Sequence, residues 1–194
     1  MNEATLRLAL YGGAALCAAA FIGLAVWAWR RAQRQRRRLV QLIESIAPDY
    51  QRDVLIPDGL DGWYHVDFLL RTSIGLVILD VRDVRGAVFG GEHMSEWTVM
   101  DRSSRRTFLN PLETLYDRMA AVRALGGDDV PVEGRVVLLS RARFATAAPP
   151  RTLLMESVAD LAAPATEVGD LYCTAWREVS TQTQPTPRAL RRSA

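Results

Sequence analysis

The stretch of sequence that decides the fold reads WYHVDFLLRTSIGLVILDVR, from Trp63 to Arg82. Residues 63–70 alternate apolar and polar side chains before becoming apolar, and residues 76–81 form a nearly continuous run of Leu, Val and Ile. Such a run is typical of a strand that is buried on both faces of a sheet. We therefore expect two neighbouring strands, with Gly75 as the hinge of the hairpin between them.

A helix and several shorter elements surround this hairpin. Asn110 and Pro111 begin the helix, because Asn suits the cap and Pro suits the first turn, and Gly126 and Gly127 stop it. The other elements that we expect are a helix over 39–47, strands over 50–56, 87–89, 97–100, 135–140 and 152–155, a polar turn over 101–106, and helices over 158–162 and 168–179. This order predicts an α/β fold, a mixed sheet with helices packed on it.

The N-terminal segment predicts a single transmembrane helix. Residues 8–29 carry no charged side chain, and at about 1.5 Å per residue they are long enough to cross a hydrocarbon core of about 30 Å. The alternative is a cleaved signal peptide with small residues such as Ala18 and Ala20 at its cleavage site. A signal peptide carries its positive charge before the apolar run, however, and here the charge follows it.

Six arginines form a collar directly after this segment, at positions 30, 31, 34, 36, 37 and 38. The positive-inside rule then places the N-terminus outside an inner membrane and the rest of the chain in the cytoplasm. We expect membrane lipid to be bound by residues 8–29 and by the collar, which attracts anionic headgroups. The sequence does not reveal whether the domain has a protein partner.

The remaining chain divides into one domain and a tail. We expect an anchor over 1–29, the collar over 30–38, an α/β domain over 39–179 and a disordered tail over 180–194, which is poor in apolar residues. The segment 39–187 holds 14 Arg against 21 Asp and Glu, a net charge of −7. An acidic domain argues against a broad electrostatic grip on nucleic acid, although it leaves such a partner open.

Three charged residues of the central hairpin form the candidate catalytic site. Asp80 and Arg82 share one face of their strand, and the hairpin can bring Asp67 beside them. Two carboxylates that hold Mg²⁺ and a cation that stabilises phosphate are what a magnesium-dependent phosphodiesterase needs. The alternative is an ordinary ion pair with a solvent-facing Asp67. His65 and His93 are isolated, and we expect them to be surface or core residues.

The order of these residues resembles the nuclease-related domain (NERD) family, within the PD-(D/E)xK restriction-endonuclease-like superfamily. The matching stretches are WYHVDFLLRTSIGLVILDVRDVRGAVFGGEHMSEWTV, FLNPLETLYDRMAAVRAL and GRVVLLS. Asp67, Asp80, Arg82, Gly86, Gly90, Trp97, Asn110 and Pro111 fall in order on the family pattern. The resemblance implies a restriction-endonuclease-like sheet behind the transmembrane helix, catalytic residues Asp67, Asp80 and Arg82, and Mg²⁺ held by the two aspartates.

The chain also departs from the family pattern at three places. Arg82 replaces the catalytic lysine, in a chain that has no lysine at all. The glutamate of the preceding helix is missing, since Gln35 and Arg36 stand there and Glu44 is offset, and Thr114 replaces a glutamine. Two hypotheses follow. The domain is a metal-dependent nuclease with a degenerate site, or it is a non-catalytic binding or scaffold module at the membrane.

Overall fold

The computed structural model describes residues 3–102, 104–139 and 141–187, and for residues 3–19 and 32 it describes only the backbone. Two compact units divide the chain, Met1–Arg38 and Leu39–Ala194. The helix α1 (Glu3–Ile46) begins in the first unit and ends in the second. It is uninterrupted, so the predicted anchor, collar and first amphipathic helix form one continuous element.

The first unit contains the segment that we predicted to be a membrane anchor. Its described apolar side chains between residues 21 and 29, among them Phe21, Leu24 and Trp29, are exposed. Among the described residues, no helix is both long enough and apolar enough to cross a membrane. The anchor over 8–29 therefore finds no support here and stays a prediction, and the side chains of residues 8–19 lie outside the described part of the chain.

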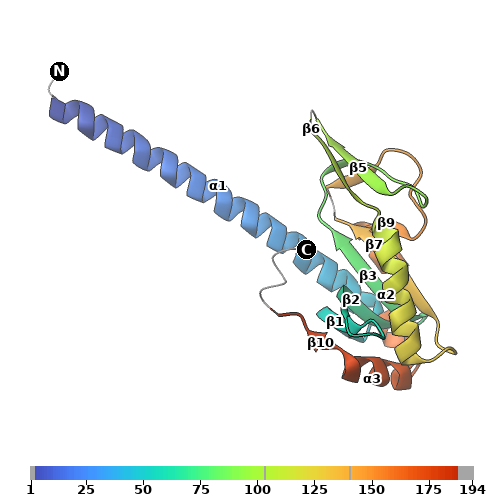
Figure 1. The fold of residues 1–194 in the computed structure, drawn as a ribbon. Helices are drawn as coiled ribbons and strands as arrows, with labels where there is room; N and C mark the ends of the chain where they lie inside the picture. Colours follow the sequence, from blue (N-terminus) through green and yellow to red (C-terminus); the bar gives the residue numbers. More distant parts are fainter. Residues whose placement is uncertain (1–2, 103, 140, 188–194) are drawn as a thin grey trace. The chain divides into compact units, whose positions relative to one another are not determined.

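A six-stranded mixed sheet forms the centre of the second unit (Figure 1). Its strands, in spatial order, are β10 (Gln184–Pro185), β1 (Asp49–Pro57), β2 (Trp63–Thr72), β3 (Gly75–Arg82), β7 (Val132–Leu138) and β9 (Thr152–Leu154). From β10 to β3 each strand is antiparallel to the next, whereas β3, β7 and β9 run parallel to one another. The predicted mixed α/β fold and the hairpin of β2 and β3 are confirmed.

Helices cover this sheet, and β3 is buried on both faces. On one side lie α2 (Pro111–Gly126) and α3 (Cys173–Gln182), which pack with Leu76 and Ile78. On the other side, the end of α1 and the 3₁₀ helix η1 (Met155–Asp160) pack with Val77 and Leu79. Alternate side chains of one strand thus enter two cores, which explains the continuous apolar run of the sequence.

A second, four-stranded sheet was not predicted as a separate layer. Its order is β6 (Ser104–Leu109), β5 (Glu96–Asp101), β4 (Gly86–Phe89) and β8 (Ala142–Phe144). Trp97 is fully buried in it, as expected for a core residue, and a Cβ atom at Gly90 would lie 2.5 Å from its ring. The predicted polar turn over 101–106 is wrong in extent, because β6 already begins at Ser104. An exposed edge strand needs no apolar side chains, so these residues carry no apolar alternation that would predict a strand.

The C-terminal region is ordered further than the sequence predicted. We expected disorder from residue 180, but α3 continues to Gln182 and β10 pairs with β1. The backbone N–H of Thr186 also donates to the carbonyl of Asp53, at 2.8 Å. The reason is that a short strand is held by main-chain hydrogen bonds, which need no apolar pattern. Residues 188–194 of the predicted tail lie outside the described residues, and the 3₁₀ turn η2 (Ala165–Glu167) precedes α3.

Candidate active site

The candidate site lies where β2 and β3 separate. The two strands pair from Thr72 opposite Gly75 to Phe68 opposite Leu79, and the next opposed residues are Asp67 and Asp80. There the Oδ2 atom of Asp67 accepts a hydrogen bond from the backbone N–H of Val81, at 2.8 Å. A carboxylate thus provides the acceptor beyond the last paired residues. The structure places both predicted carboxylates at this one point.

Asp80 is enclosed by two arginines. Its side chain is only 2% exposed, and Arg82 places Nε 2.7 Å from Oδ1 and Nη2 2.9 Å from Oδ2. Arg118 of α2 donates from Nη1 to the same Oδ2, at 2.5 Å. A buried carboxylate needs such partners, because burial of an unpaired charge is very costly. Both oxygens of Asp80 are therefore bound by guanidinium groups in this structure.

Asp67 has a different environment from Asp80. Burial raises the pKa of the Asp67 carboxyl group above its ordinary value, and the negative charge of Asp80 adds to this effect. The hydrogen bond from Val81 and the positive charges of His65 and Arg118 act in the opposite direction but do not cancel it. A partly buried carboxylate with a raised pKa, next to a second carboxylate, forms a place where a cation would be stabilised.

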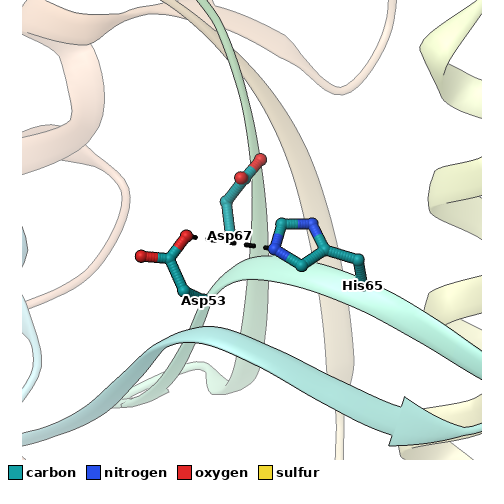
Figure 2. Close-up of side chains that lie close together, drawn as sticks. All are labelled: Asp53, His65 and Asp67. Carbon is teal, nitrogen blue, oxygen red and sulfur yellow. Dashed lines mark ion pairs between the residues drawn. The ribbon is translucent and has the colours of Figure 1, made fainter. Parts of the chain in front are cut away.

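A second group of side chains includes Asp67 and was not predicted. Asp53 of β1 lies opposite Asp67, between the paired residues 52 and 54, and it has a left-handed φ of 51°. His65 of β2 completes the group, with Nε2 3.9 Å from Oδ1 of Asp53 (Figure 2). One potential ligand atom from each of the three residues lies within 4.8 Å of the other two. The prediction that His65 is isolated is therefore wrong, because strand pairing brings it to two carboxylates.

This donor set fits a divalent cation only in part. Asp67 and Asp53 offer carboxylate oxygens, which suit Mg²⁺ as well as Mn²⁺, whereas an imidazole nitrogen suits transition metals better. Asp80 fits less well, because an arginine must leave it before it can bind a metal. The residues thus support a divalent metal near Asp67, and they do not single out Mg²⁺.

The other positions of the sequence pattern have structural roles. Asn110 caps α2 as predicted: its Oδ1 accepts from the N–H of Leu112 at 3.0 Å, and its Nδ2 donates to the carbonyl of Glu92 at 2.9 Å. Thr114 donates to the carbonyl of Pro111, and Glu44 accepts from the hydroxyl of Tyr50. These two residues therefore do not replace the missing glutamine and glutamate of the family.

Sequence reasoning missed Arg118, which nevertheless left a signal. Leu115, Met119 and Val122 mark the buried face of α2, and Arg118 lies three residues from the first and four from the last. An arginine on the buried face of a helix needs an acidic partner inside the protein. No sequence signal indicated Asp53, because its position opposite Asp67 depends on a backbone conformation that the sequence does not show.

A comparison with known protein families gives a match that covers the candidate site. The model of the nuclease-related domain, NERD, matches residues 31–139. The chain belongs to the NERD family. The match extends over α2 and every strand from β1 to β7, so it includes each of the site residues described above. No curated protein and no solved structure matches the chain. For this NERD domain the family thus indicates a nuclease-related function, and its chemistry has to be argued from the site.

Proposed function

We propose that this NERD domain is a metal-dependent nuclease with a degenerate active site, a member of the restriction-endonuclease-like superfamily that cleaves phosphodiesters slowly. The observation that carries the proposal is the meeting of Asp67 and Asp80 at the separating ends of β2 and β3, with two guanidinium groups beside them. Carboxylates for a metal and cations for a phosphate then lie at one place. These are the two parts that phosphodiester hydrolysis requires.

Each residue of the site has a definite task in this proposal. Asp67 provides the principal oxygen ligand for a divalent cation, with Asp53 and His65 close enough to join it, and Asp80 is the second carboxylate. A bound divalent cation supplies Lewis-acid polarisation of a phosphoryl oxygen and lowers the pKa of water. Arg82 and Arg118 bind the phosphate with planar, bidentate donors and stabilise the charge that develops on it.

The same residues explain why the proposed activity is weak. Arg82 stands where the family has a lysine, and a guanidinium group cannot lose its proton to act as a base. The ion pairs of Asp80 with Arg82 and Arg118 must also break before its oxygens can bind a metal or accept a hydrogen bond from water. The phosphate of a substrate can break these ion pairs, since it competes for the same two arginines.

The test measures metal binding and cleavage in the same samples. The full-length chain is titrated with Mg²⁺ and Mn²⁺ by calorimetry, and labelled single- and double-stranded DNA and RNA report cleavage. Asp67→Asn keeps an oxygen that can accept from Val81, so we expect it to fold and to lose both metal binding and cleavage. Asp117→Asn makes the same change on the exposed side of α2 and should alter neither. Metal-dependent cleavage that survives in Asp67→Asn would refute the assignment.

A second candidate function is a non-catalytic binding or scaffold module. The ion pairs that enclose Asp80 favour it, because they give this carboxylate a purely structural role. The same experiment separates the two candidates. Absence of metal binding and of cleavage in the unchanged chain would favour the module, whereas cleavage that is lost on chelation would exclude it.

We also propose that the N-terminal segment holds the domain at the cytoplasmic face of an inner membrane, with the N-terminus outside. The support is the uncharged stretch 8–29, the exposed apolar side chains at its end, and the six arginines that follow. Membrane fractions washed with alkaline carbonate should retain the full-length chain. A protease added to intact spheroplasts should leave the domain uncut. Release by carbonate would refute the anchor, and digestion would refute the orientation.

A further inference from the structure

The hairpin of β5 and β6 carries an exposed group of arginines in an otherwise acidic domain. Four consecutive residues of β6, from Ser104 to Thr107, are exposed, and β6 is the edge strand of its sheet. Arg105 and Arg106 belong to this stretch, and Arg102 lies at the turn with a left-handed φ of 52°. The segment 39–187 has a net charge of −7. Positive charge is thus concentrated where the domain as a whole is negative.

These arginines are not used by the fold. Among the described residues, no acidic side chain forms an ion pair with Arg102, Arg105 or Arg106. The acidic residue nearest in sequence, Asp101, pairs instead with Arg85 of the connection before β4, at 3.1 Å. Two arginines on this edge strand and a third at its turn, with no ion pair among the described residues, indicate a surface for an external anion.

A short connection joins the hairpin's sheet to the candidate active site. Arg82 ends β3, and only three residues separate it from Gly86, where β4 begins. Gly86 packs closely on the end of β5: a Cβ atom there would lie 2.2 Å from the carbonyl oxygen of Met100 and 3.0 Å from the Cα of Asp101. The end of β5 is therefore linked through the start of β4 to the end of β3 by a short connection, and Figure 1 shows the hairpin projecting at that end of the sheet.

We propose that the β5–β6 hairpin binds the phosphate backbone of duplex nucleic acid and holds it against the site at the end of β3. The proposal rests on the proposed nuclease function, because it supplies the substrate of that same site. Alternation along β6 directs Arg105 and Arg106 to opposite faces of the sheet, at its exposed edge. Arginines on both faces of one edge strand can contact successive phosphates along the backbone of a duplex. An extended, partly apolar partner that paired along the edge strand would not require arginines on both faces of the sheet.

The test measures binding without cleavage. Fluorescence anisotropy follows the full-length chain, purified in neutral detergent, as it binds a labelled DNA duplex of about 20 base pairs, two helical turns, in EDTA. The variant is Arg105→Gln with Arg106→Gln. Its matched control is Arg123→Gln with Arg177→Gln, which removes the same charge from exposed positions of α2 and α3. Salt is varied from about 50 to 200 mM, because the slope counts the phosphates that the protein contacts.

We expect the hairpin variant to weaken binding roughly tenfold to a hundredfold at 0.1 M salt and to reduce the slope of log K against log salt by about 2. The control should bind as the unchanged chain does. Equal binding by the hairpin variant, or an equal loss in the control, overturns the proposal. Binding to anionic vesicles is measured with the same variants. If the hairpin variant loses binding to vesicles and keeps binding to the duplex, the proposal is overturned in favour of a lipid surface. Asp67→Asn should bind the duplex normally, so failure of cleavage and failure of this proposal are distinguishable.

Discussion

The ion pairs around Asp80 allow a quantitative test by a double-mutant cycle. Asp80→Asn removes the charge and leaves Arg118, whose side chain is 16% exposed, without its acidic partner. Loss of one partner from a buried pair typically costs about 3–5 kcal/mol. We expect about 3 kcal/mol, the lower end, because the Arg82 side chain is 35% exposed and can turn to solvent.

The second arm of the cycle is Arg118→Gln, which leaves Asp80 with Arg82 alone. Loss of a hydrogen bond to a charged group costs about 1.5–3 kcal/mol. In the double variant neither charge of the Asp80–Arg118 pair remains unpaired. Its loss of unfolding free energy should therefore be smaller than the sum of the two single losses by at least about 1 kcal/mol. Urea unfolding of the full-length chain, followed by far-ultraviolet circular dichroism, gives the three free energies.

An exposed ion pair provides the matched control for this cycle. Asp101→Asn makes the same substitution in the pair with Arg85, whose side chains are 35% and 54% exposed. We expect its cost to stay below about 1 kcal/mol, as for most surface ion pairs. Costs of Asp80→Asn and Arg118→Gln that add to within about 0.5 kcal/mol would show that the two side chains do not interact as the structure has them.

Three further predictions concern positions outside this ion-pair group. Gly90→Ala should lower the free energy of unfolding by about 1–3 kcal/mol, because the new Cβ atom would lie 2.5 Å from the indole ring of Trp97. Gly91→Ala is the control, and thermal unfolding should show little change for it, because the atom nearest to its Cβ would be 3.4 Å away. Asn110→Ala should cost about 1–2 kcal/mol through loss of the α2 cap, and a denaturation midpoint as high as that of the unchanged chain would contradict it. At Glu133, burial tends to raise the carboxyl pKa, but two arginines outweigh burial and lower it, so its stabilising effect is present above about pH 4.5 and is lost as the pH falls through the lowered pKa. Glu133→Gln should therefore remove that part of the pH dependence of unfolding, and an unchanged pH profile would refute this assignment.

Several features of the molecule were predictable because they depend on neighbours in the chain. The apolar run 76–81 indicated a strand buried on both faces, and the structure confirms it with Ile78 and Leu79 in opposite cores. Asn110 indicated a helix cap from its own side chain, and it is one. The carboxylates of Asp67 and Asp80 were expected side by side, because hairpin pairing follows from a two-residue period and one glycine hinge.

The partners of those carboxylates were decided by tertiary structure alone. Arg118 reaches Asp80 from α2, 38 residues away, because the helix packs on the face of the sheet that carries Asp80. Asp53 and His65 join Asp67 through the pairing of β1 with β2 and through the left-handed conformation of Asp53. The sequence by itself therefore determined the central strands and the acidic pair, since local periodicity encodes them, and the order of its motifs indicated the NERD family. Which cations and ligands surround that pair was decided only when distant segments packed together, because such contacts leave no periodic pattern in the chain.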